Sequence, residues 1–215
     1  MGLFDLFKGK KNGFELQGNV SGAIRSDTEM EKINKEEAEE AFKEQKKKLD
    51  KYMAEKGFLK YKTKAYVKRS ENDVLEYVDL QKDHYGSKTF TVNYALIPLY
   101  VKHDFLTYDL GDRLGKLICQ KDIWWDYADE NTASTSFQNV MHAIDAYLIP
   151  WFEQASTTDG TKDVLLQEKK ERELYGGRLS DIQSEWFDKI DNHSDCGEVI
   201  RENQRTLKLP MKLFE

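Results

Sequence analysis

The chain has 215 residues, which is enough for one domain with short appendages. Its net charge of −6 argues against a dedicated nucleic-acid-binding protein, and no segment approaches the roughly 20 apolar residues that span a bilayer. Aromatic residues make up 12%, which indicates a packed interior because disordered chains are poor in them. The two cysteines, Cys119 and Cys196, lie far apart and form no metal-binding pattern. We therefore expect a cytoplasmic protein with no metal and no cofactor.

The first 26 residues are predicted to form an N-terminal arm and linker. Met1–Lys8 carries four large apolar residues that could line one face of a short helix, docked on this domain or on a neighbouring chain. The alternative is a weak contact with a membrane surface through residues 1–8, because lysines follow directly. Residues 9–26 contain four glycines and little periodicity, which is typical of a linker.

A long helix is predicted next. The run Ser26-Asp27-Thr28-Glu29 has the form of a capping box, which opens a helix. Apolar residues follow at helical spacing up to Met53, and Gly57 is a natural residue to end the helix.

Three consecutive strand-like segments follow. In Leu59–Lys68, apolar residues alternate with basic ones, which predicts a half-exposed strand with a basic face. Val74–Gln81 and Thr89–Val101 come after short polar turns, so the three segments predict an antiparallel meander. The short aromatic run D-I-W-W-D-Y, residues 122–127, is either a fourth strand or a packed loop.

The clearest helix is predicted over Thr132–Ala155, where apolar residues form one broad stripe. Pro150 lies inside it and should kink or break it, because proline lacks the backbone N–H. One or two charged helices follow, up to residue 190. The predicted fold is α+β, with an antiparallel meander of three to four strands and helices packed on one face. It occupies residues 27–190, and residues 191–215 are predicted to form a C-terminal tail.

Several segments resemble a known family. These are G-F after a Lys-rich helix, V-D-L-Q-K-D-H-Y, F-T-V-N-Y-A, D-R-L-G, D-I-W-W-D-Y and I-P-W-F-E-Q-A-S-T. Their order is similar to that of the bacterial domain-of-unknown-function family 4304, over roughly residues 38–174. The resemblance implies a bacterial source and an α+β domain, and it implies no catalytic residue.

Two groups of residues are candidates for a ligand site. Gln81 and Asn93 lie at the inner ends of paired strands, where their amides could bind a ligand or complete a structural hydrogen-bond network. Arg113 has a glycine two residues away on each side and precedes Trp124 and Trp125. A guanidinium stacks well on indole, so Arg113 could anchor a planar or anionic partner, or it could pin a loop through a carboxylate.

These candidates allow three functions. The first is a non-catalytic module that binds a protein or a small ligand, because no nucleophile or phosphate-loop motif is present. The second is an enzyme with a site near Arg113 and His103 that lacks a sequence motif, in which His103 is the obvious base. The third is a weak binder of nucleic acid or of an acidic partner. It would use the basic face formed by Lys60, Lys62, Lys64 and Lys68. Lysines also protect exposed edge strands from aggregation, which is the preferred explanation of this face.

Overall fold

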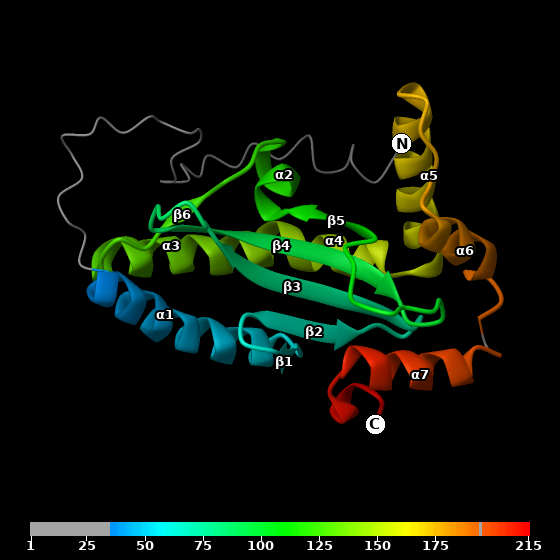
Figure 1. The fold of residues 1–215 in the computed structure, drawn as a ribbon, viewed down its shortest axis with the longest axis horizontal. Coiled ribbons are helices and arrows are strands. Elements are labelled where there is room, and N and C mark those ends of the chain that lie inside the picture. Colours follow the sequence, from blue (N-terminus) through cyan, green and yellow to red (C-terminus); the bar gives the residue numbers. More distant parts are fainter. Residues whose placement is uncertain (1–34, 194) are drawn as a thin grey trace.

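A computed structural model describes residues 35–193 and 195–215, and its centre is an antiparallel sheet of six strands. Strands β1 to β5 follow one another across the sheet in chain order, and β6 pairs with the start of β4 (Figure 1). The strands are β1 (Leu59–Tyr61), β2 (Ala65–Arg69), β3 (Val74–Lys82), β4 (Thr89–Pro98), β5 (Leu110–Arg113) and β6 (Trp125–Asp126). The predicted α+β class with an antiparallel meander is confirmed. The predicted capping box at residues 26–29 and the predicted membrane contact of residues 1–8 lie outside the described residues.

The segment Leu59–Lys68 forms a tight hairpin rather than the one strand predicted. β1 and β2 pair through Tyr61 and Ala65, and the three residues between them reverse the chain. Lys62 takes a φ of 54°, a left-handed conformation that ends an extended segment. The alternation of apolar and basic residues therefore does not describe one continuous face. Together with β5 and β6, this hairpin enlarges the sheet beyond the three to four strands predicted.

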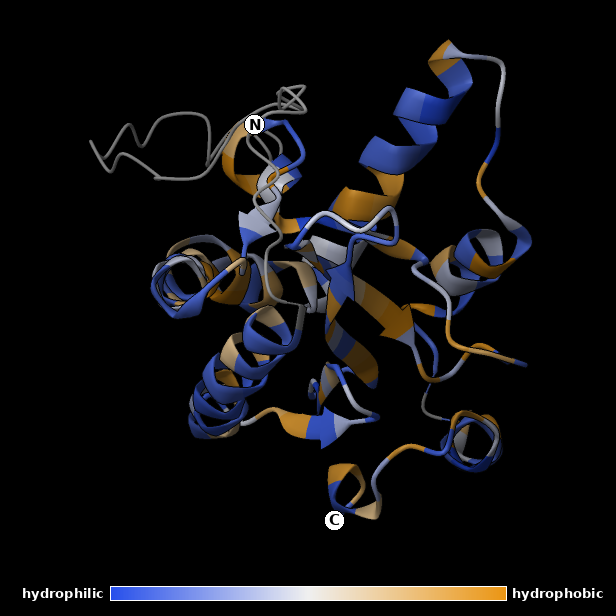
Figure 2. Cartoon of the chain, turned by 60° about the vertical axis from the view of Figure 1, so that its left-hand side comes forward, coloured by the Kyte–Doolittle hydropathy of each residue, from blue (hydrophilic) through white to orange (hydrophobic). Residues whose placement is uncertain are grey.

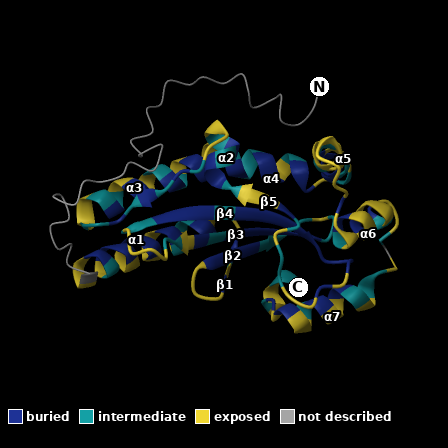
Figure 3. Cartoon of the chain, turned by 45° about the horizontal axis from the view of Figure 1, so that its top comes forward, coloured by how far each residue is buried: buried dark blue, intermediate teal, exposed yellow. Residues whose placement is uncertain are grey.

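One face of the sheet, termed the helix face, is covered by three helices that run along it (Figure 3). They are α1 (Lys35–Glu55), α3 (Glu130–Ala143) and α4 (Ile149–Ala155). Phe42 of α1 lies with its ring centroid 5.3 Å from that of Phe137 of α3 and 5.4 Å from that of Phe90 of β4. Both pairs are edge to face, the arrangement that aromatic rings prefer. The apolar stripe predicted over Thr132–Ala155 thus forms the main cover of the core.

A wide helical turn, η1 (Ile144–Leu148), joins α3 to α4. The N–H of Ile149 donates to the carbonyl of Ile144, five residues back, which is the hydrogen bond of a π-helix. Pro150 follows at once, and it offers no N–H and would crowd the carbonyl of Ala146 in a regular α-helix. The interruption predicted at Pro150 is therefore a wide turn within one continuous helical rod.

The other face of the sheet, termed the open face, is covered at one end by the C-terminal segment. That segment holds α7 (Gly197–Leu207) and the short helix η2 (Met211–Leu213). The hydroxyl of Tyr61 donates to the carbonyl of Leu207 at 2.7 Å, and the guanidinium of Arg69 lies over the ring of Phe214. Residues 191–215, predicted as a tail, thus contain a helix that packs on the sheet.

Three further helices complete the described residues. They are α2 (Leu114–Cys119), α5 (Thr158–Leu174) and α6 (Asp181–Lys189). Helix α5 projects from the body of the molecule, apolar near its base and mostly hydrophilic further out (Figure 2). Val164 and Leu165 are buried at that base, whereas every residue from Lys169 to Arg178 is exposed.

Candidate functional site

The open face becomes polar where the C-terminal segment leaves it uncovered. Along β3, every second residue points to this face, which brings Asp79 and Gln81 to it. Asn93 of β4 lies directly across from Asp79, and Arg113 of β5 lies directly across from Asn93. Three neighbouring strands therefore place one acid, two amides and one guanidinium on the same surface.

The amide of Asn93 links its neighbours. Its Nδ2 donates to Oδ1 of Asp79 at 2.9 Å and to Oε1 of Gln81 at 3.2 Å. An amide nitrogen has two hydrogens, so both are used. The network therefore sets the orientation of Gln81: its oxygen faces Asn93 and its NH2 group faces away from it.

A shallow cavity of about 250 Å³ lies over these residues. It is lined by Gln81, Asn93, Tyr108, Gly111, Asp112 and Arg113. Three of the six residues predicted for a ligand site are thus brought together, although they come from three different strands. The other three, Trp124, Trp125 and His103, are not among the lining residues.

Arg113 is held in place on two sides. Its Nη1 donates to Oδ2 of Asp122, and its guanidinium lies 5.1 Å from the ring centre of Trp124. Both arrangements considered for this residue are present together, the stacking on indole and the ion pair with a nearby carboxylate. Because its flat surface and one nitrogen are already fixed, Arg113 meets the cavity in a preset orientation.

Tyr108 forms the wall of the cavity that does not come from the sheet. Its hydroxyl donates to Oδ2 of Asp79 at 3.0 Å, and its ring packs edge to face on Tyr77 at 5.6 Å. Burial raises the pKa of Asp79 above its usual value, while hydrogen bonds from Asn93 and Tyr108 act in the opposite direction. Burial raises the pKa of Tyr108 to about 12, so its hydroxyl stays protonated and remains a donor.

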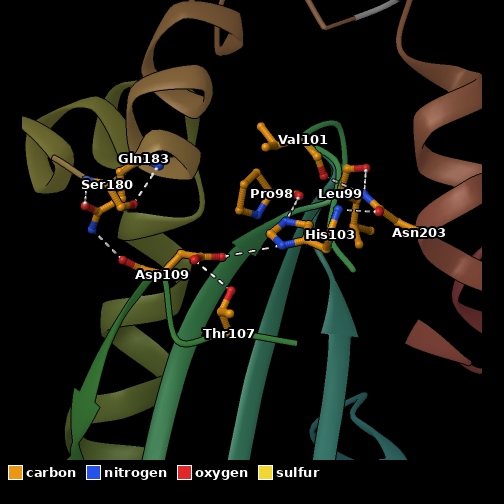
Figure 4. A network of polar contacts seen from close by, with 9 residues as sticks. All are labelled: Pro98, Leu99, Val101, His103, Thr107, Asp109, Ser180, Gln183 and Asn203. Atoms are coloured by element: carbon orange, nitrogen blue, oxygen red, sulfur yellow. Dashed lines mark hydrogen bonds and ion pairs between the residues drawn. The ribbon is translucent and has the colours of Figure 1, made fainter. Parts of the chain in front are cut away.

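His103 lies elsewhere, in a buried network between α6 and α7 (Figure 4). Its Nε2 is 2.9 Å from the carbonyl oxygen of Pro98, an acceptor, so Nε2 carries the proton. Its Nδ1 faces Oδ2 of Asp109 at 3.8 Å, and burial raises the pKa of that carboxyl. The backbone N–H of His103 donates to Oδ1 of Asn203 on α7. The network therefore fastens the chain after β4 to the C-terminal helix.

Trp125 is part of the core. It is 1% exposed and lies with its ring centre 6.1 Å from that of Phe90, on the helix face. The run D-I-W-W-D-Y therefore separates its two tryptophans: Trp124 supports Arg113 and Trp125 fills the interior.

The four lysines of the predicted basic face have different surroundings and do not form one continuous basic surface. Lys60 pairs with Asp50 at 2.8 Å, and Lys68 lies over the ring of Phe58 and 3.5 Å from Glu76. Lys62 lies over the ring of Tyr61, and Lys64 ends the turn between β1 and β2. Two of these charges are thus matched by carboxylates within the domain.

Metal-binding clusters and membrane-spanning helices are both absent from the described part of the chain, residues 35–193 and 195–215. It contains no group of three or more His, Cys, Asp or Glu side chains placed to hold a metal ion. It also contains no helix that is both long and apolar enough to cross a bilayer.

Two side chains of the hydrogen-bond network at the site, Tyr108 and Asp79, were not predicted from the sequence. Tyr108 lies in an irregular segment, and no spacing rule connects it to strands β3 and β4. Asp79 could have been found, because a carboxylate two residues before Gln81 in an alternating strand must share its face. Its pairing with Asn93, by contrast, depends on the register of β3 and β4, for which the sequence carries no direct signal.

One family model matches the central part of the chain. No curated protein and no solved structure matches the chain. Residues 49–154 match the model of a domain of unknown function (DUF4304), and this range includes every residue that lines the cavity. The predicted resemblance to this family is confirmed for those residues.

Proposed function

We propose that the protein is a non-catalytic binding module whose ligand occupies the cavity on the open face. The observation that carries this proposal is the convergence of Gln81, Asn93 and Arg113 from three strands around one cavity that Tyr108 closes at the side. Rigid strands hold such groups in fixed positions, which lowers the cost of binding. The volume of about 250 Å³ is below the roughly 300–1,000 Å³ of drug-sized pockets, so the ligand is a small molecule or one side chain of a protein.

The placement of His103 favours binding over catalysis. A general base must reach the reacting group, yet His103 is 2% exposed and does not line the cavity with Arg113. Of the carboxyl groups at the cavity, Asp79 already accepts hydrogen bonds from Asn93 and Tyr108, and Asp112 accepts one from the backbone N–H of Arg113. The polar groups of the cavity are therefore arranged to hold a ligand.

The proposal is tested by titration of 15N-labelled protein with a panel of amino acids, small acids, amides, amines and nucleosides. A ligand of the cavity should shift the side-chain amide signals of Gln81 and Asn93 in the parent and leave them unchanged in an Arg113→Ala variant. Arg178→Ala is the matched control, because that arginine side chain is 90% exposed and does not line the cavity. The proposal fails if no compound shifts these signals, or if the shifts persist in Arg113→Ala.

We also propose that the module works in the cytoplasm of a bacterium. The bacterial source rests on the family resemblance. The cytoplasm is supported by two free thiols, Cys119, which is exposed, and Cys196, which is half-buried. Free thiols persist in reducing compartments. Fractionation of cells that express the full chain, followed by thiol labelling, should find reduced protein in the cytosolic fraction. Recovery in another fraction would contradict the proposal.

A further inference from the structure

The cavity has hydrogen-bonding groups that the protein already uses and donors that it does not, and this difference limits the chemistry of the ligand. Both carboxylate oxygens of Asp79 accept bonds, one from Asn93 and one from Tyr108. The amide oxygen of Gln81 accepts the second bond from Asn93. These acceptors are already used within the protein.

Two side chains at the cavity, by contrast, have N–H donors that the described residues do not use. The NH2 group of Gln81 faces away from Asn93, and no acceptor for it is present among the described residues. Arg113 uses Nη1 for Asp122, and a guanidinium has five N–H groups in all. A ligand that supplies two acceptors in one plane would satisfy both side chains at once.

Arg113 is the one cationic residue among the described residues that line the cavity, and the carboxylates of Asp79 and Asp122 beside it already accept hydrogen bonds. Asp112 also lines the cavity, but it lies opposite Tyr94, whose ring packs on Trp151 on the helix face. By strand alternation its side chain belongs to the helix side of β5, whereas that of Arg113 belongs to the open face. Arg113 is therefore the charged group of β5 that faces the ligand.

We propose that the ligand binds through a carboxylate, held between the guanidinium of Arg113 and the NH2 group of Gln81, with Tyr108 against its hydrocarbon part. This assignment rests on the binding function proposed above and narrows it to one class of ligand. A guanidinium and a carboxylate fit each other as two planar groups, and such charge-assisted bonds are the stronger ones in proteins. The carboxylate belongs to a small free acid or to an acidic side chain of a partner protein.

The test uses the 15N-labelled full chain with four probes at equal ionic strength: sodium succinate, sodium acetate, acetamide and methylammonium chloride. Succinate and acetate should shift the side-chain signals of Gln81 and Arg113, and acetamide should bind at least about tenfold more weakly because it lacks the charge. Equal binding of acetamide, or tighter binding of methylammonium, would overturn the carboxylate assignment while leaving the site in place. Silence from every probe and from the wider panel would count against the site itself.

Gln81→Glu is the decisive variant. A carboxylate at this position still accepts the bond from Asn93, so the internal network is kept, but the two donors are replaced by a negative charge. We expect it to lower the affinity for succinate by at least about tenfold. Gln204→Glu is the matched control, with the same chemical change on α7 at a residue that does not line the cavity. Unchanged succinate affinity in Gln81→Glu would overturn the assignment.

The source of the carboxylate is resolved by one further probe, the blocked peptide acetyl-Gly-Asp-Gly-amide. Tighter binding of the free acids identifies a small-molecule ligand, and tighter binding of the peptide identifies an acidic side chain of a partner protein. Both outcomes support the carboxylate, and the absence of binding by the acids and the peptide alike contradicts it.

Discussion

The two faces of strands β3 and β4 are built from the same two stretches of sequence, yet one face belongs to the core and the other carries the candidate site. On the helix face, Val78 and Leu80 oppose Tyr94 and Val92, and all four are buried. On the open face, the alternate residues include Asp79, Gln81 and Asn93, none of which is fully buried. One strand pair thus supplies the core with one set of side chains and the candidate site with the other.

The largest effect should come from the helix face. Phe137 is fully buried and contacts the rings of Phe42 and Phe90. Phe137→Ala removes a large apolar side chain and leaves a cavity, so we expect it to lower the free energy of unfolding by about 3–5 kcal/mol. Urea denaturation measures this loss. A change below about 1 kcal/mol would mean that α3 is not the main cover of the core, and Glu130→Ala, at an exposed residue of the same helix, serves as the control.

The covered end of the open face should be nearly as sensitive. Asn203 accepts a bond from the His103 N–H, and its Nδ2 donates to the carbonyls of Leu99 and Val101 at 2.8 and 2.6 Å. Asn203→Ala leaves three backbone groups without a partner, and we expect it to cost about 2–4 kcal/mol of stability, since each buried unpaired group costs roughly 1–3 kcal/mol. Thermal and urea unfolding measure it. Asn192→Ala, at an exposed position, should have little effect, and equal losses in both variants would contradict the network.

A smaller effect concerns an acid that interrupts the helix face. Glu76 is buried with Lys68 3.5 Å away, and burial raises the pKa of its carboxyl above the usual 4.5. The folded state therefore holds this proton to higher pH than the unfolded state does, so the contribution of Glu76 to stability is greatest at low pH and is lost as the pH rises through the raised pKa. Glu76→Gln cannot ionise. Compared with the parent, its stability should fall less between pH 4 and pH 7, as followed by urea unfolding at each pH. The same fall in both proteins would contradict a raised pKa.

The smallest effect is expected for the lysines near β1 and β2. Because Lys60 pairs with Asp50 and Lys68 with Glu76, these charges are partly matched inside the domain. We expect no saturable binding of single-stranded or duplex oligonucleotides at low salt. Tight binding that weakens steeply with salt, and that is lost in Lys60→Ala or Lys64→Ala, would restore the third function predicted from the sequence.

The contrast between the two faces also explains which features could be predicted from the sequence and which could not. Continuous apolar periodicity marks the core, so the meander and the stripe of Thr132–Ala155 were predicted correctly. The hairpin turn at Lys62 was missed, because lysine carries no signal for a left-handed conformation. Gln81, Asn93 and Arg113 were singled out separately, but their meeting depends on strand register, and Tyr108 reaches them through an irregular segment. Residue type can therefore indicate which residues belong to a site, whereas the fold determines which of them come together.

The wide turn η1 has a consequence for the length of the chain that this fold tolerates. An α-helix rotates by about 100° per residue, and a π turn holds one residue more than an α turn. The turn therefore resets the rotational phase of α4, so that Trp151 and Phe152 reach Tyr94, with ring centres 4.8 and 6.3 Å away. Deleting one residue between Ile144 and Leu148 would swing both rings round the helix axis by up to about 100°. At this point the fold depends on a residue count as much as on residue identity, so a single-codon deletion should do more harm than most substitutions there.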